Sequence, residues 1–177
     1  MIYYRSPFRE DKNLGKALND EINLIPKGSW ICMTDYDTCF LTPHFNRRME
    51  HHIKLRPDTG IFTCYTNRVQ RLEQCVTGRC DNNSDIRYWK AIANSILKHK
   101  GKVKEIPMEI SGVCMMFNKS LWKSVGGFKE GIGCLGVDNE FCWSALKLNK
   151  KILLMEDIFI FHYYRLIEGI QNKDHLK

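Results

Sequence analysis

Short apolar runs that alternate with segments of helical periodicity constrain the fold of this sequence more than any other feature. The run Trp30–Met33 is continuously apolar and short, which is typical of a central strand covered on both faces. The segment before it places Leu14, Leu18 and Ile22 at the spacing of one helix face. This alternation predicts an α/β fold with three α/β/α layers and a mostly parallel, Rossmann-like central sheet.

The same two patterns predict the individual elements. Helices are expected after a cap at Asp11, over Pro43–Leu55, from Ser84 or Asp85 towards Gly101, around Leu121–Val125 and from Asp138 to Leu148. Residues 66–83 are expected to be loop. Strands are expected at Ile2–Tyr4, Trp30–Met33, Ile61–Tyr65, Ile110–Phe117, Ile152–Met155 and Ile158–Phe161.

Length and composition predict a single domain. The 177 residues, of which 44% are hydrophobic, can bury one sizeable core, which we expect within residues 1–165, followed by a polar tail at 166–177. No apolar stretch approaches the roughly 18 to 20 residues of a membrane span and no signal-peptide core is evident, so a cytoplasmic location is expected. The eight cysteines are then expected to be free thiols, and the pair Cys75 and Cys80 alone does not indicate a zinc site.

The net charge of the chain favours anionic partners but does not identify one class of them. An excess of 27 basic over 20 acidic residues gives a net charge of +7, which favours phosphates, anionic lipid headgroups or nucleic acid. A nucleic-acid-binding module would gather basic and aromatic positions on one predicted face, and the basic residues are instead spread along the chain. We therefore expect no nucleic-acid partner, and peripheral contact with the inner face of a membrane stays open.

Two carboxylates directly follow the second predicted strand. Asp35 and Asp37 stand at the carboxyl end of Trp30–Met33, and open α/β sheets bind their ligands at such ends. Two carboxylates in a crevice repel each other and lose solvation unless a cation or hydrogen-bond donors compensate. Mg²⁺ or Mn²⁺ would bind one or both and complete its coordination with phosphate oxygens and water. The Asp-x-Asp pattern is common in loops, so its position after an apolar strand carries the argument.

Three motifs follow one another between Ile110 and His162. They are Ser111-Gly112-Val113 on a predicted strand, Val125-Gly126-Gly127-Phe128 at a turn, and Val137-Asp138-Asn139-Glu140 at a helix start. In this order they resemble the acceptor half of family 2 glycosyltransferases, which have the GT-A fold, a vGGF turn and an acidic ED-x-D helix start. Val137 stands in place of the first Glu of that acidic element.

The resemblance extends upstream and spans most of residues 13–162. Asn13-Leu14-Gly15-Lys16-Ala17-Leu18-Asn19 and Gly28–Asp37 are similar to the family's N-x-G…N helix and GD-x-hhh-x-D-x-D strand. They imply a nucleotide-binding half at about 1–65 and an acceptor half at about 105–165. The family's P-x-Y-N first strand and its strand with an acidic base-reading site are not evident.

The resemblance implies a metal-dependent, hexosyltransferase-like enzyme. It would move a sugar from a nucleotide-diphosphate sugar to a hydroxyl of a saccharide or lipid-linked saccharide, with inversion. Asp138 would be the catalytic base, and Glu140 would bind acceptor hydroxyls or support the site. Mn²⁺ or Mg²⁺ would be held by Asp35, Asp37 and His162. The implied donor-binding residues are Arg5, Asn13, Lys16, Asp35 and Gly112.

Two other functions fit the same layered fold. A sugar-phosphate nucleotidyltransferase would need a glycine-rich and basic phosphate loop near the first strand, and Ser6-Pro7-Phe8-Arg9 is a poor version of one. A degenerate, non-catalytic sugar-nucleotide-binding domain would fit the shortened N-terminal region. Turnover of a donor would distinguish this domain from an enzyme.

The glycine-rich loop Gly131–Gly136 directly precedes Asp138. Its glycines allow unusual backbone angles, and the apolar residues between them could cover a ligand, so we expect the loop to order over a bound donor. A rigid turn that only starts the helix is the alternative.

Overall fold

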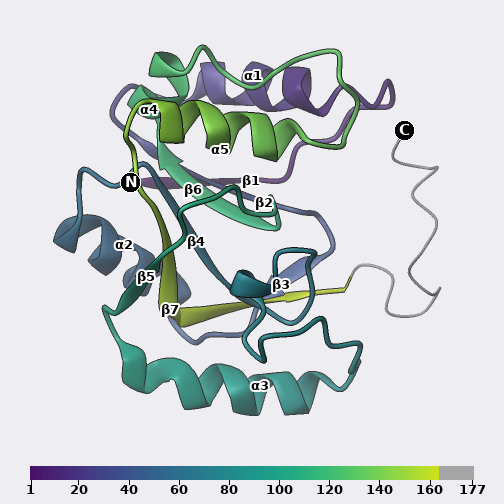
Figure 1. The fold of residues 1–177 in the computed structure, drawn as a ribbon, viewed down its shortest axis with the longest axis vertical. Helices are drawn as coiled ribbons and strands as arrows, with labels where there is room; N and C mark the ends of the chain where they lie inside the picture. Colours follow the sequence, from purple (N-terminus) through teal and green to yellow (C-terminus); the bar gives the residue numbers. More distant parts are fainter. Residues whose placement is uncertain (164–177) are drawn as a thin grey trace.

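The computed structural model describes residues 1–163 (Figure 1). The predicted polar tail at 166–177 and the predicted domain end at 165 lie outside these residues. The strands are β1 (Ile2–Arg5), β2 (Trp30–Thr34), β3 (Thr38–Phe40), β4 (Ile61–Thr66), β5 (Val103–Glu105), β6 (Cys114–Asn118) and β7 (Ile152–His162). The helices are α1 (Leu14–Leu24), α2 (Phe45–Leu55), α3 (Ile86–Ser95), α4 (Lys119–Ser124) and α5 (Val137–Lys147), with short 3₁₀ helices η1 (Leu72–Gln74) and η2 (Ile96–His99).

The seven strands form one mixed sheet. Their order is β1-β2-β6-β4-β7-β3, and β5 pairs with β7. The pairs β1–β2 and β4–β7 are parallel, whereas the other pairs are antiparallel. Because β6 runs against both β2 and β4, the strands β1, β2, β4 and β7 point the same way. The predicted mostly parallel sheet is thus a mixed one, and its four co-directional strands end at one edge, on the right of Figure 1.

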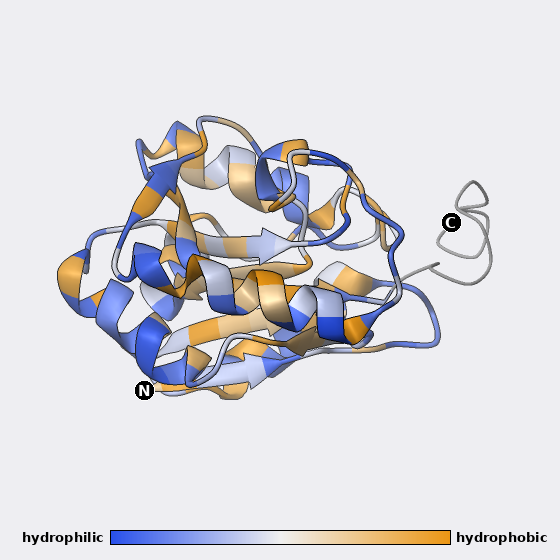
Figure 2. Cartoon of the chain, turned by 90° about the horizontal axis from the view of Figure 1, so that it is seen from below, coloured by the Kyte–Doolittle hydropathy of each residue, from blue (hydrophilic) through white to orange (hydrophobic). Residues whose placement is uncertain are grey.

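Helices cover both faces of the sheet, as the predicted three-layer arrangement requires. Ile31 and Met33 of β2 contribute to a buried cluster with α1, α4 and α5, and the alternate residues Trp30 and Cys32 contribute to a cluster with α2 on the other face. Helix α3 packs Trp89 on the second half of β7. The helices carry hydrophilic and hydrophobic residues together, as amphipathic helices do (Figure 2).

The C-terminal strand differs from its prediction. The two strands expected at 152–155 and 158–161 are one strand, β7, because the intervening Asp157 is buried and bound by α2. His52 Nε2 donates to one of its carboxylate oxygens at 2.6 Å and Arg48 Nη1 to the other at 2.9 Å. Two short strands, β3 and β5, were not predicted, and both pair with β7.

Two smaller differences arise near the candidate site. The strand predicted over 110–117 is shorter, since β6 begins at Cys114 after a turn. Asp11 does not cap α1 as predicted; it accepts a hydrogen bond from the backbone of Asn13, whose own side chain caps the helix. Within residues 1–163, no helix is both long and apolar enough to cross a membrane.

Candidate functional site

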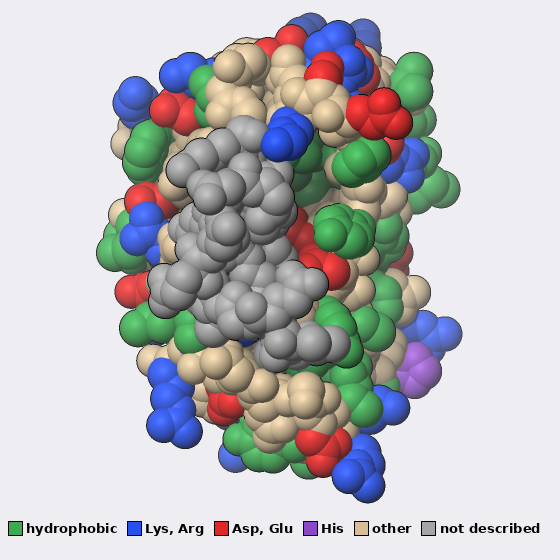
Figure 3. Space-filling view, turned by 90° about the vertical axis from the view of Figure 1, so that its right-hand side faces the viewer, with side chains coloured by type: hydrophobic (Ala, Val, Ile, Leu, Met, Phe, Trp, Pro, Cys, Tyr) green, Lys and Arg blue, Asp and Glu red, His purple; other side chains and the backbone are tan. Residues whose placement is uncertain are grey.

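The ends of the co-directional strands bring most of the candidate residues to one edge of the sheet. Strand β1 ends at Arg5, β2 is followed by Asp35 and Asp37, and β7 ends at His162. Strand β6 starts at the same edge, so Gly112 lies there too. Figure 3 shows the face towards which these ends point, with acidic side chains near its middle beside hydrophobic ones. Ligands of open α/β sheets bind at such an edge.

Asp35, Asp37 and His162 converge at this edge. One ligand atom from each lies within 4.8 Å of the other two. His162 Nε2 is 3.6 Å from Asp35 Oδ2 and 3.6 Å from Asp37 Oδ1. The unpredicted strand β3 makes this possible, because Thr38 pairs with His162 in antiparallel register and Tyr163 N donates to the carbonyl oxygen of Asp37.

The ring of His162 is oriented through its other nitrogen. Nδ1 lies 2.9 Å from the carbonyl oxygen of Arg68. When the neutral ring donates its hydrogen there, Nε2 presents a lone pair to the two carboxylates. A hydrogen bond of this kind, on the nitrogen that does not bind the ion, is typical of histidine metal ligands.

The side chains of the cluster change the pKa values of Asp35 and His162. The pKa of Asp35 is raised to about 6, mainly by partial desolvation; the charge of His162 lowers this pKa, and the charges of Asp37 and Asp138 raise it. Burial lowers the pKa of His162, but the carboxylates of Asp37 and Asp35 outweigh burial and the pKa is raised above 6.5. Asp35 and the imidazole of His162 therefore hold on to protons that a cation would displace.

The donor set fits a divalent cation. The two carboxylates are ligands that Mg²⁺ and Mn²⁺ prefer, and the imidazole nitrogen is a common ligand of transition metals. The side chain of Asp35 is 49% exposed, so water or phosphate oxygens can reach the cluster.

Asp138 lies in the first turn of α5 and contacts the segment just before β6. Its Oδ2 accepts from Gly112 N at 2.7 Å, and its Oδ1 accepts from Asn139 N at 2.9 Å. Burial raises the pKa of Asp138 despite these hydrogen bonds, which suits a carboxylate that accepts a proton. A Cβ at Gly112 would lie 3.3 Å from the Asp138 side chain, so the missing side chain makes room for Asp138. The approach of Gly112 to a donor sugar stays a prediction.

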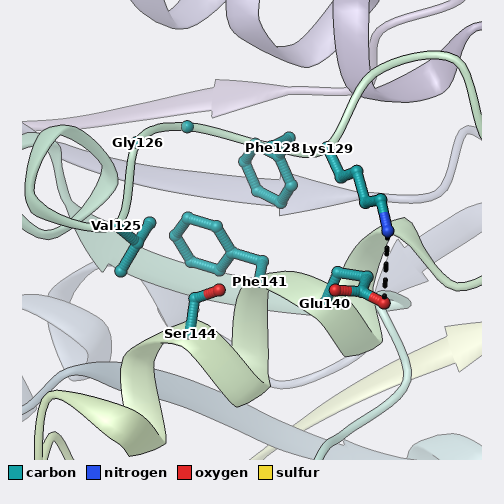
Figure 4. Close-up of a pocket in the computed structure, with 8 residues that line it drawn as sticks. Val125, Gly126, Phe128, Lys129, Glu140, Phe141 and Ser144 are labelled. Carbon is teal, nitrogen blue, oxygen red and sulfur yellow. Dashed lines mark ion pairs between the residues drawn. The ribbon is translucent and has the colours of Figure 1, made fainter.

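Glu140 lies on a different face of α5 from Asp138. Two positions apart on a helix, the two side chains project roughly 200° from each other around the axis. Glu140 Oε1 lies 3.8 Å from Lys129 Nζ, at a cavity of about 200 Å³ that Phe128 and Phe141 also line (Figure 4). The role expected for Glu140, in which it binds acceptor hydroxyls or supports the site, stays a prediction.

The predicted donor-binding residues of β1 and α1 have partners within the chain. Arg5 Nε lies 3.0 Å from Glu21 Oε2, and Lys16 Nζ lies 3.1 Å from an acid one turn further along α1. Asn13 caps α1 and also accepts from Gly131 N at 3.1 Å, which attaches the glycine-rich loop to this helix. Of these three, only Arg5 stands at the end of a sheet strand.

Two site residues were missed in the segment that was expected only to be loop. Asn67 and Gln74 are both fully buried, with 0% exposure. Asn67 contacts the backbone of His162, and Gln74 contacts the backbone of Ser111. Asn67 directly follows β4, so the strand-end rule that selected Asp35 could have found it, whereas no sequence signal indicates Gln74.

A basic groove lies along α2, on another part of the molecule. Its volume is about 520 Å³, and its charge suits an anion. No Phe, Tyr or Trp is among the residues that line it, so it lacks the stacking platform of single-stranded nucleic-acid sites. The lining residues are His44, Arg47, Arg48, Glu50, His51, Lys54 and Lys100.

Comparison of the sequence with models of protein families and with curated proteins finds no match in either. The function is therefore inferred from the geometry of the sheet edge and from the motifs of the sequence.

Proposed function

We propose that the chain is a metal-dependent glycosyltransferase that moves a sugar from a nucleotide-diphosphate sugar to an acceptor hydroxyl, with inversion. The observation that carries this proposal is the convergence of Asp35, Asp37 and His162 at the edge where the co-directional strands end, the edge at which Asp138 contacts Gly112. The order of motifs that resembles family 2 glycosyltransferases supports the same class.

In this proposal one group of residues acts on the diphosphate of the donor, and Asp138 acts on the acceptor. Asp35, Asp37 and His162 would hold Mn²⁺ or Mg²⁺, and a bound cation would supply positive charge to offset the charge that develops on the departing diphosphate. Asp138 accepts the proton of the acceptor hydroxyl. At the same time the oxygen of that hydroxyl bonds to the anomeric carbon, and the bond from this carbon to the diphosphate breaks. The hydrogen bond from Gly112 N holds Oδ2 of Asp138 and so fixes the orientation of the carboxylate.

The first test is Mn²⁺-dependent thermal stabilisation by a panel of UDP-, GDP- and other sugar donors, because a ligand that favours the folded state raises Tm. The donor that stabilises the chain is then incubated with saccharide acceptors, and release of nucleoside diphosphate is measured. Asp37→Asn should abolish the Mn²⁺-dependent shift, and Asp58→Asn, at an exposed acid in a turn, is the matched control.

The outcomes separate the functions that share this fold. Release of nucleoside diphosphate coupled to a glycosylated product supports the proposal. Formation of a nucleotide sugar from a sugar phosphate indicates nucleotidyl transfer instead. Stabilisation without any turnover indicates a binding domain, and the absence of any Mn²⁺-dependent shift contradicts the cation site itself.

A further inference from the structure

The segment that follows β4 is closed on itself and carries both buried amides. Val76 N donates to the carbonyl oxygen of Thr66 at 3.0 Å, and Thr66 and Cys75 form a parallel bridge. We call residues 66–76 the amide loop. Asn67 lies near its first end and Gln74 near its second, and each amide binds a different part of the candidate site.

Asn67 binds both backbone groups of His162. Its Oδ1 accepts from His162 N at 2.7 Å, and its Nδ2 donates to the carbonyl oxygen of His162 at 3.1 Å. The next residue of the loop, Arg68, provides the carbonyl oxygen at 2.9 Å from Nδ1 of the His162 ring. Consecutive residues of the amide loop thus fix both the backbone position and the ring orientation of this histidine.

Gln74 binds both backbone groups of Ser111. Its Oε1 accepts from Ser111 N at 2.7 Å, and its Nε2 donates to the carbonyl oxygen of Ser111 at 3.2 Å and to Thr63 Oγ1 at 2.9 Å. The next residue, Gly112, donates its N–H to Asp138 at 2.7 Å. Gln74 therefore acts on Asp138 through one peptide unit.

We propose that the amide loop sets the position of the cation ligand relative to the base, with Asn67 as the positioning residue for His162 and Gln74 as the positioning residue for Asp138. The roles of His162 and Asp138 rest on the proposed function; the hydrogen bonds do not. Loss of a partner behind a metal ligand typically weakens metal affinity about 10- to 100-fold, and a buried polar group left unsatisfied loosens its surroundings.

The first experiment measures the affinity for Mn²⁺ alone by calorimetry. Asn67→Leu and Gln74→Met remove the hydrogen bonds and keep similar volumes. The control is Thr42→Val, which removes a buried hydrogen bond to the backbone of Phe159 on β7, the strand that also carries His162. We expect Asn67→Leu to weaken Mn²⁺ binding about tenfold or more. Gln74→Met and the control should stay within about twofold of the unmodified chain.

The second experiment needs no metal. At alkaline pH, where the ring is neutral, the ¹⁵N shifts of the His162 ring should change from one dominant tautomer to a mixture in Asn67→Leu. The amide hydrogen of Gly112 should exchange about tenfold faster in Gln74→Met. Thr42→Val should change neither. If an apolar variant does not fold, Asn67→Ser or Gln74→Glu replaces it, with the same expected direction.

The two experiments separate this inference from the proposed function. An unchanged His162 tautomer in Asn67→Leu, or unchanged Gly112 exchange in Gln74→Met, would overturn the positioning roles. If both metal-free measurements change as expected but the unmodified chain does not bind Mn²⁺, the positioning of the two side chains stands and the cation role of the proposed function fails.

Discussion

The side-chain amide of Asn19 pairs with both backbone groups of Phe128, more than a hundred positions later in the chain. Its Nδ2 donates to the carbonyl oxygen of Phe128 at 2.9 Å, and its Oδ1 accepts from Phe128 N at 2.8 Å and from Trp122 Nε1 at 2.9 Å. On the same helix, a Cβ at Gly15 would lie only 2.0 Å from the carbonyl oxygen of Lys129. The motif that resembles the N-x-G…N helix therefore joins α1 to the turn that leads to α5.

Replacing Asn19 should lower the stability of the fold. Asn19→Ala leaves the two backbone groups of Phe128 and the indole N–H without their partner, so we expect a loss of roughly 3 kcal/mol in the free energy of unfolding. Urea unfolding measures this loss. Asn23→Ala, at an exposed asparagine of the same helix, should stay within about 0.5 kcal/mol, and equal effects at the two positions would contradict the role of Asn19.

Gly15→Ala should also destabilise the chain, although alanine is the better helix former by about 1 kcal/mol. The added methyl group would overlap the carbonyl oxygen of Lys129, a backbone atom that cannot rotate away, so we expect a net loss of about 2 kcal/mol. The same unfolding measurement decides the sign. A gain in stability would show that α1 shifts freely against the turn.

Asp157 should make stability depend on pH below about pH 4. Burial raises its pKa, but the hydrogen bond from His52 and the charge of Arg48 outweigh burial, so the pKa is lowered from 3.8. A group with a lowered pKa in the folded state contributes stability above its unfolded value, and this contribution is lost as the pH falls through the folded value.

The test compares urea unfolding at pH 7 and pH 3. Asp157→Asn should lower the free energy of unfolding by roughly 3 kcal/mol at pH 7, because one partner of a buried pair is removed. Between pH 7 and pH 3, the free energy of unfolding of this variant should then decrease less than that of the unmodified chain. Asp58→Asn, at an exposed acid, should have the same free energy of unfolding as the unmodified chain at pH 7 and at pH 3. If the stability of Asp157→Asn depended on pH in the same way as that of the unmodified chain, the Asp157 carboxylate would not be the source of the stability lost at low pH.

Substitutions at the candidate site should separate cation binding from proton transfer. Asp37→Ala should weaken Mn²⁺-dependent donor binding and turnover together, because it removes a ligand. Asp138→Asn should preserve donor affinity and lower kcat by at least about a hundredfold, the lower scale of general-base catalysis. Donor titration and steady-state kinetics provide the two readouts, and an equal loss of donor affinity in both variants would refute this division.

The glycine-rich loop should become protected when a donor binds. Gly131, Gly133 and Gly136 have φ values of 75°, 77° and 81°, and the loop contacts α1 through the hydrogen bond between Gly131 N and Asn13. Ile132 and Leu135 are exposed at 36% and 42% and could cover a ligand. Hydrogen exchange across residues 129–138 should be slower with Mn²⁺ and the stabilising donor than without them. Unchanged exchange at saturation would favour a rigid turn.

The sequence predicted the long elements of the fold and missed those that depend on distant partners. Strand β2 was recognisable because its apolar run needs no context. Strands β3 and β5 are short, and only their pairing with β7 makes them strands. Strand β7 was divided at Asp157, because a charged residue normally interrupts a buried strand and its partners lie on α2, about a hundred positions earlier.

The candidate site shows the same limit. Asp35 and Asp37 could be selected from their place after a strand, and His162 from the resemblance to a family. Gln74 could not, since an amide in a loop follows no pattern. Glu140 was selected from a motif, although the helical period that places Asp138 beside Gly112 turns Glu140 away from it.

Strand β7 imposes an order of assembly on the cluster that it completes. During synthesis, Asp35 and Asp37 emerge more than a hundred residues ahead of His162, and β7 must then insert between β4 and β3. A nascent chain that stops before this strand holds two carboxylates with no imidazole to join them. Affinity for a cation would therefore report that β7 has inserted into the sheet. A ribosome-bound chain of increasing length would acquire this affinity in a single step.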